Sequence, residues 1–244
     1  MVEHHDHAPV ATFVCDARLA TGVALRLGDE AAHHARVKRL AVGDSVRATD
    51  GAGLLATGEI VELTRGSLEI AVHTTERIPR PAPIHLRAPV ADRERMLWLA
   101  EKATELGVAS WQAVRFRRSM SVSPRGEGDA FAAKVAARMR AALEQSGGAW
   151  LPALLPETSI DALTIGEHQA GIMLDVSGAS IGDVVRRAND SEPVVLVGPE
   201  GGIEPAERAM LAASNWVPAR LAPATLRFET AGIAAIAVLR ASSL

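Results

Sequence analysis

The second two-thirds of this 244-residue sequence alternates between strand patterns and helix patterns. Short β-branched or apolar runs (IHLRAPV, SWQAVRF, GIMLDV, PVVLVG and PARLA) are each followed by a stretch with helical character. The first such stretch starts at Asp92, a good N-cap residue, and stops at Gly107. Regular alternation of this kind predicts an α/β fold, in which helices cover both faces of a parallel sheet.

The N-terminal third has a different pattern. Over residues 10–76, short alternating strands are separated by Gly, Asp and Ser turns, with one helix expected over 29–40, and this predicts a small β-barrel. The segment RIPRPAP has three prolines in seven residues, which is typical of an extended linker. We therefore predict a barrel domain at 1–76, a linker at 77–83 and an α/β domain at 84–244.

Composition limits the class of protein. Hydrophobic residues make up 48% of the sequence, enough for a sizeable core. No apolar run approaches the roughly 18 residues of a membrane span, and the N-terminus lacks a signal-peptide pattern, so we expect a cytoplasmic protein with no membrane partner. A single cysteine, Cys15, cannot form an internal disulfide. His4, His5 and His7 lie at the terminus, and we expect no metal site.

The net charge of −3 hides a local excess of basic residues. Between Arg115 and Arg140 there are seven basic residues and two acidic ones. Such a cluster is typical either of a solvated helix face or of a surface that binds a polyanion. Under the second interpretation, the predicted RNA footprint consists of Arg36, Lys38, Arg39, Arg115, Arg117, Arg118, Arg138 and Arg140.

Aromatic residues are scarce, at 3% of the sequence, and tyrosine is absent. Extensive stacking of bases on aromatic side chains is therefore not expected, and recognition of a structured RNA by its shape is favoured. The four tryptophans are expected to be core or dimer contacts: Trp98, Trp111, Trp150 and Trp216.

One strand-to-helix junction, VVLVGPEGGIEPAE, carries a glycine-rich turn with Glu200 in its middle. Ligands of open parallel sheets bind at the carboxyl ends of the strands, where this turn is expected. It is not a phosphate loop, because no Gly-Lys-Ser/Thr follows and a carboxylate would repel phosphate; G-x-G-x-x-G is also absent. The turn favours a ligand that the backbone approaches closely and that has no phosphate there.

A second unusual segment, RLAPATLRFETA, runs from the next strand into the last helix, expected over 230–243. Glu229 and Thr230 are expected at the N-cap and first turn of that helix, directly after Arg227. Each segment alone is compatible with an ordinary tight turn and a capped helix. Their occurrence in this order near the C-terminus favours one shared site.

These two segments, together with EKATELGV and ALEQSGG, resemble the ribosomal small subunit methyltransferase E family, and HHARVKRLAVGDSV resembles the barrel of the same family. The resemblance implies a SPOUT-type parallel sheet with a trefoil knot, a PUA-like N-terminal β-barrel and a homodimer. It also implies methylation of N3 of a uridine in 16S rRNA near the decoding centre. The implied cofactor is S-adenosylmethionine, and the implied partner is 16S rRNA or the small ribosomal subunit, not DNA.

The resemblance also implies site residues. Arg227, Glu229 and Glu200 are the expected catalytic residues: the arginine would stabilise charge on a uridine carbonyl oxygen, and a carboxylate would accept the imide proton. The family usually has Gly, Arg, Thr and Arg where this chain has Ala222, Ala224, Phe228 and Gly148. Expected cofactor-binding residues are Leu174, Val197, Gly198, Pro199, Glu200, Gly201, Gly202, Leu221, Ala222, Pro223 and Leu226.

Two other functions remain open at this point. One is a SPOUT enzyme that methylates a ribose 2′-oxygen or a different base. The other is an RNA-binding protein that has kept the fold and lost catalysis, which the departures at Ala222, Ala224 and Phe228 would permit. The intact glycine-rich turn, Arg227 and Glu229 argue against the second alternative.

Overall fold

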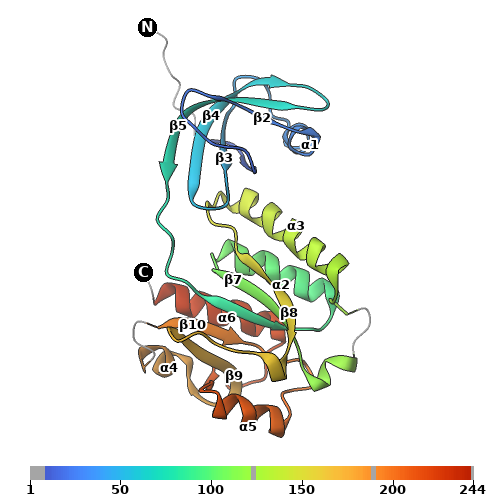
Figure 1. Ribbon diagram of the computed structural model, residues 1–244, viewed down its shortest axis with the longest axis vertical. Coiled ribbons are helices and arrows are strands. Elements are labelled where there is room, and N and C mark those ends of the chain that lie inside the picture. Colours follow the sequence, from blue (N-terminus) through green and yellow to red (C-terminus); the bar gives the residue numbers. More distant parts are fainter. Residues whose placement is uncertain (1–8, 122–124, 188–190, 243–244) are drawn as a thin grey trace. The chain divides into compact units, whose positions relative to one another are not determined.

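The computed structural model describes residues 9–121, 125–187 and 191–242 (Figure 1). The chain divides into two compact units, one made of Met1–Arg80 with Leu143–Leu151 and the other of Pro81–Ala142 with Pro152–Leu244. None of the helices in the described ranges combines the length and hydrophobicity of a membrane span. The described residues also contain no group of three His, Cys, Asp or Glu side chains that could hold a metal. His4, His5 and His7 lie outside these ranges.

The first unit is built on a curled five-stranded sheet, which is the predicted barrel. The strand order is β1-β3-β4-β5-β2, and neighbouring strands are antiparallel except β1 and β3. Phe13, Ile60 and Ile70 fill its core, with Ala32 and Ala35 of the helix packed against them. The elements are β1 (Thr12–Val14), β2 (Ala24–Leu27), α1 (Asp29–Val37), β3 (Ser45–Thr49), β4 (Leu54–Leu63) and β5 (Leu68–Arg77).

Residues 143–151 pack with this unit although the sequence assigns them to the α/β part. Trp150 lies directly over Gly53, where an added Cβ would be 2.3 Å from the indole ring. The Nε1 of Trp150 donates to the carbonyl oxygen of Ile78 at 3.1 Å. Gly53 has a φ of 95°, a left-handed conformation that favours glycine, so both its backbone and its neighbour exclude a side chain.

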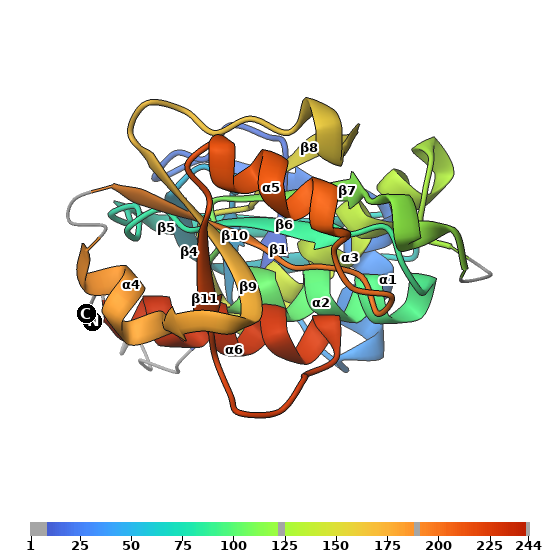
Figure 2. The same cartoon turned by 90° about the horizontal axis from the view of Figure 1, so that it is seen from below.

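The second unit contains a six-stranded, all-parallel sheet in the order β11-β9-β10-β6-β7-β8. Helix α5 covers one face, and α2 and α6 cover the other (Figure 2). The α/β fold class and the parallel sheet are therefore confirmed. The elements are β6 (His85–Pro89), α2 (Arg93–Glu105), β7 (Ser110–Arg115), η1 (Arg117–Ser121), α3 (Asp129–Ser146), β8 (Ala153–Ser159), η2 (Ile160–Ala162), β9 (Gln169–Ser180), α4 (Ile181–Arg187), β10 (Glu192–Leu196), α5 (Pro205–Ala213), β11 (Val217–Arg220) and α6 (Phe228–Ala241).

Several boundaries differ from the sequence prediction. The last helix begins at Phe228, not Thr230, because Phe228 is buried and starts the apolar stripe that packs on the sheet. Its N-cap is Arg227, so placing Glu229 at the N-cap was wrong. Helix α1 ends at Val37, three residues early, and Arg39 already has a left-handed φ of 59°.

One strand was missed altogether. Strand β8 lies at the edge of the sheet, and its residues are mostly half-buried or exposed. It contains Pro156, which an edge strand tolerates because one side of its backbone needs no ladder partner. Its sequence therefore lacks the apolar run by which the inner strands are recognised.

Candidate functional site

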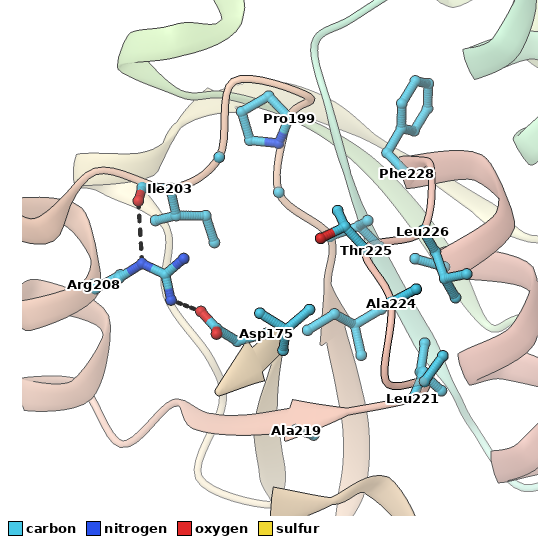
Figure 3. A pocket seen from close by; sticks show the side chains of 17 residues that line it. Asp175, Pro199, Ile203, Arg208, Ala219, Leu221, Ala224, Thr225, Leu226 and Phe228 are labelled. Atoms are coloured by element: carbon cyan, nitrogen blue, oxygen red, sulfur yellow. Dashed lines mark hydrogen bonds and ion pairs between the residues drawn. The ribbon is translucent and has the colours of Figure 1, made fainter. Parts of the chain in front are cut away.

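Three loops surround a cavity of about 250 Å³ (Figure 3): one bulges out of β9, and the other two follow β10 and β11. Most of its lining is apolar, with side chains such as Val197, Ile203, Leu221 and Leu226. The polar side chains at its edge include Asp175 and Arg208. Apolar walls with accessible backbone and a few polar groups suit the nucleoside part of S-adenosylmethionine.

The first wall is a bulge inside β9. Met173 pairs with Pro218 of β11, but the next pair joins Ala179 to Ala219, so residues 174–178 leave the ladder. Leu174 is therefore in a bulge within the strand rather than at its end. At the point of return, a Cβ on Gly178 would lie 2.5 Å from the backbone nitrogen of Ala219, which explains the glycine.

The second wall is the glycine-rich turn after β10. The backbone N–H of Gly202 donates to the carbonyl oxygen of Pro199 at 2.8 Å, and Gly202 has a φ of 74°. A Cβ on Gly198 would lie 2.8 Å from Cγ1 of Ile203. These two glycines thus allow the turn to fold back and keep its backbone accessible to a ligand.

The third wall is the loop from Leu221 to Arg227, which leads into α6. It contributes apolar and small side chains to the cavity, including Ala224 and Thr225. Eight predicted cofactor-binding residues lie in the lining: Leu174, Val197, Gly198, Pro199, Gly202, Leu221, Ala222 and Leu226. The lining does not include Glu200, Gly201 or Pro223.

The lining also contains residues that the sequence analysis missed. The most informative is Asp175, which is buried and forms an ion pair with Arg208 of α5 (Figure 3). Its Oδ1 accepts hydrogen bonds from the backbone and side chain of Ser177. A carboxylate directly after the apolar run GIML was a signal that could have been noticed. The other additional lining residues are Val176, Ile203, Ala219, Ala224, Thr225, Phe228 and Ala231.

The predicted catalytic residues lie around an arginine that the sequence analysis did not single out. Arg95, in the first turn of α2, has its Nη1 3.5 Å from Oε1 of Glu200 and its Nε 3.8 Å from Oε1 of Glu229. Glu229 is only 8% exposed, and its Oε2 has no hydrogen-bond partner. Arg227 is exposed and lines the same cavity as Arg95 and Glu229.

Most of the predicted basic footprint in the second unit is paired with carboxylates. Arg115 pairs with Glu157, and Arg138 lies 3.0 Å from Glu101. Because these acids come from outside the 115–140 segment, the local charge excess counted along the sequence is reduced in space. Arg140 is half-buried. In the first unit, Lys38 and Arg39 are exposed, and Arg36 donates to the carbonyl oxygen of Thr64 at 2.8 Å.

Two further footprint residues contact the glycine-rich turn or the start of α5. Arg118 donates from Nη1 to the carbonyl oxygen of Gly201 at 2.8 Å, and its Nε lies 3.4 Å from Glu204. The backbone N–H of Arg117 donates to the buried carboxylate of Glu207 at 2.8 Å. Arg117 and Arg118 therefore help to hold the turn and the start of α5 in place.

A family model described as an RNA methyltransferase domain matches residues 79–240. The chain belongs to this RNA methyltransferase family. A second model, the RNA methyltransferase PUA domain, matches residues 27–72.

The resemblance inferred from the four motifs is confirmed by relatives that carry the name of the ribosomal small subunit methyltransferase E family. The protein of that name from Mycobacterium bovis is 29% identical over 242 residues, which cover 92% of this chain and 88% of the relative. The Neisseria gonorrhoeae protein of that name, solved bound to S-adenosylmethionine, has a TM-score of 0.85 at 24% identity, covering 97% of this chain and 98% of that one. A Legionella pneumophila protein, solved in complex with the same cofactor, has a TM-score of 0.83 at 23% identity, covering 95% of this chain and 97% of that one.

Proposed function

We propose that this chain methylates N3 of a uridine in 16S rRNA near the decoding centre of the small ribosomal subunit, using S-adenosylmethionine. Membership of the RNA methyltransferase family supports the reaction class. The observation that carries the proposal is the position of the apolar three-loop cavity beside the cluster of Arg95, Glu200 and Glu229. A cofactor site and a proton acceptor then occur at the same edge of the sheet.

In this proposal the cofactor is held by the three loops. Backbone groups around Gly198 and Gly202 contact it closely, and Leu221 and Leu226 cover its apolar parts. Asp175, kept in place by Arg208, is suited to accept hydrogen bonds from hydroxyl or ammonium groups. When bound, S-adenosylmethionine supplies an electrophilic methyl group, whose transfer breaks an S–CH3 bond and forms the N3–CH3 bond.

Side chains outside that cavity are assigned the acceptance of the imide proton and the stabilisation of the negative charge on the base. Glu229 has a free Oε2 and is assigned the acceptance of the N3 imide proton. Arg227, which lines the same cavity, is assigned the stabilisation of negative charge on a uridine carbonyl oxygen. Glu200 shares Arg95 with Glu229 and is assigned the orientation of that arginine.

RNA binding, dimerisation and location complete the proposal. The predicted footprint of arginines and lysines would contact RNA phosphates, and Lys38 and Arg39 are exposed to solvent. Binding should then weaken steeply as salt rises, because phosphate contacts release counterions. The enzyme is proposed to act as a homodimer in the cytoplasm, which sedimentation of the purified protein and fractionation of cells would test.

The deciding experiment incubates the purified protein with labelled S-adenosylmethionine and small ribosomal subunits from cells that lack the enzyme. Nucleoside analysis of the RNA should find the label in 3-methyluridine. Label in another nucleoside would favour the SPOUT alternative that modifies a ribose or another base. Absence of label with intact cofactor binding would favour the RNA-binding alternative.

A second experiment tests the proton acceptor. Glu229→Gln keeps the shape of the side chain but cannot take a proton, so transfer should fall by at least about 100-fold. The affinities for cofactor and RNA should stay within a factor of about two. An unchanged transfer rate would contradict the assigned role of Glu229.

A further inference from the structure

A second cavity, of about 440 Å³, lies between α2 and the start of α6. Its lining consists of Glu94, Arg95 and Trp98 from α2, and Arg227, Glu229 and Thr230 from α6. The cavity is open to solvent, and its lining includes the residues assigned to the proposed reaction, Arg95, Arg227 and Glu229. This is a different space from the three-loop cavity, since the two linings share no residue.

Trp98 distinguishes this cavity from the rest of the protein. Its side chain is 45% exposed, whereas Trp111 and Trp216 are each 2% exposed and belong to the core. Of the two roles expected for Trp98, a core residue or a dimer contact, this exposure contradicts the first. An indole ring exposed to solvent costs hydrophobic free energy, which a flat ligand stacked on it would recover.

The carboxylate of Glu229 supplies the second indication of a ligand. It is about nine-tenths buried, and its Oε2 lacks a hydrogen-bond partner. A buried acceptor without a donor is unfavourable, so the site is completed by a group that donates a hydrogen bond. Arg95 occupies only the other oxygen, Oε1, at 3.8 Å.

We infer that this cavity binds the base of the target nucleotide and selects an imide base such as uracil, with Trp98 stacking on its face. This inference rests on the proposed function. Uracil presents an acceptor, a donor and an acceptor along its pairing edge. Glu229 accepts from the N3–H, and Arg227 donates to an adjacent carbonyl oxygen. Cytosine has a lone pair at N3, which the carboxylate repels.

Arg95 acts in this arrangement as a positioning residue. By pairing with Oε1 of Glu229 and with Glu200, it orients the carboxylate so that Oε2 remains available to the base. Its removal should therefore relax the discrimination between uracil and cytosine. A purely structural role would lower stability without changing that discrimination.

The first test measures binding without catalysis. Hexauridylate should quench the exposed tryptophan fluorescence of the wild-type protein more strongly than hexacytidylate. The Trp98→Phe variant should lose this quenching, because the remaining described tryptophans are buried or half-buried. Arg95→Gln should reduce the difference between the two oligonucleotides. Equal quenching in the wild type and Trp98→Phe would overturn the inference, whether or not the protein methylates RNA.

The second test measures transfer to small ribosomal subunits in a single turnover. Trp98→Ala should be slower by about 10-fold or more, because base stacking contributes strongly per base. Trp98→Phe should restore most of the rate, and cofactor affinity should be unchanged in both. Val238→Ala, which removes part of another exposed apolar side chain on α6, is the matched control and should transfer normally.

Two outcomes of this test would overturn the base site. One is wild-type transfer by Trp98→Ala. The other is a change in the oligomeric state of Trp98→Ala, which would assign the indole to a contact between copies of the chain. If the wild-type enzyme itself forms no 3-methyluridine, the proposed function fails, while the quenching experiment still decides whether the cavity binds uracil.

Discussion

Replacing Arg118 with alanine should weaken cofactor binding, because this side chain holds the glycine-rich turn. Its Nη1 donates to the carbonyl oxygen of Gly201 at 2.8 Å, and its Nε lies 3.4 Å from Glu204. A hydrogen bond with a charged donor contributes about 1.5–3 kcal/mol. Half of this side chain is exposed, so solvent screening reduces the expected value to about 1 kcal/mol. If that free energy holds the turn in its binding form, the Kd for S-adenosylmethionine rises about fivefold.

Isothermal titration calorimetry with S-adenosylmethionine measures this change directly. Arg117→Ala is the matched control, because its guanidinium lies no closer than 3.9 Å to Asp161 and Glu204. Its backbone N–H, which bonds to Glu207, remains in the alanine variant. The reasoning is refuted if Arg118→Ala binds the cofactor as tightly as the wild type, or if Arg117→Ala weakens binding equally.

Three further substitutions, two of them paired with a control glycine, test the packing and the charges. Gly178→Ala should destabilise the protein by about 3 kcal/mol in urea unfolding, because its Cβ would lie 2.5 Å from the backbone of β11. Gly182→Ala, in α4, has its nearest contact at 3.6 Å and should not be destabilised. Gly53→Ala should lower the free energy of unfolding by about 3 kcal/mol in the same assay, because Gly53 has a left-handed φ and the indole of Trp150 lies over it, whereas Gly66→Ala should be tolerated. Equal urea midpoints for the test variant and the control variant in either pair would contradict the packing argument. The hydrogen bond from Lys102 lowers the pKa of Glu101 from its ordinary value, so Glu101→Gln should be less stable than the wild type by about 0.5 kcal/mol at neutral pH. This difference should vanish as the pH falls through the lowered pKa, and a difference independent of pH would exclude the ionic contribution.

The strand and helix patterns were sufficient to predict most of the fold. Inner strands such as β10 carry continuous apolar runs because both their faces are buried, and this made them easy to recognise. Strand β8 was missed because it is an edge strand with Pro156 and little burial. The start of α6 was placed two residues late because Glu229 resembles a cap, whereas burial of Phe228 decides where the helix begins.

The parts of the candidate site that depend on backbone turns were predicted from sequence motifs. The parts that depend on single side chains were missed. The turn at Gly198 to Gly202 and the loop after β11 were found because glycine permits unusual backbone conformations and proline fixes φ, which marks a turn in the sequence. The position of Asp175 at the cavity was not predicted because the bulge in β9 depends on pairing with β11, which local sequence does not encode. The pairing of Arg115 with Glu157 was missed for the same reason, since the two residues meet only across β7 and β8.

Arg95 shows why strand order matters more than motif order for this site. Chain order alone suggested that the loops after β10 and β11 form the site, since they carry the two unusual segments. In the sheet, however, β6 is hydrogen-bonded to β10, so the start of α2 emerges beside the glycine-rich turn. Helix α2 also packs against α6, which carries Glu229. Arg95 therefore reaches two carboxylates that follow it by more than 100 residues, and any parallel sheet with this strand order would place a helix start at the same position.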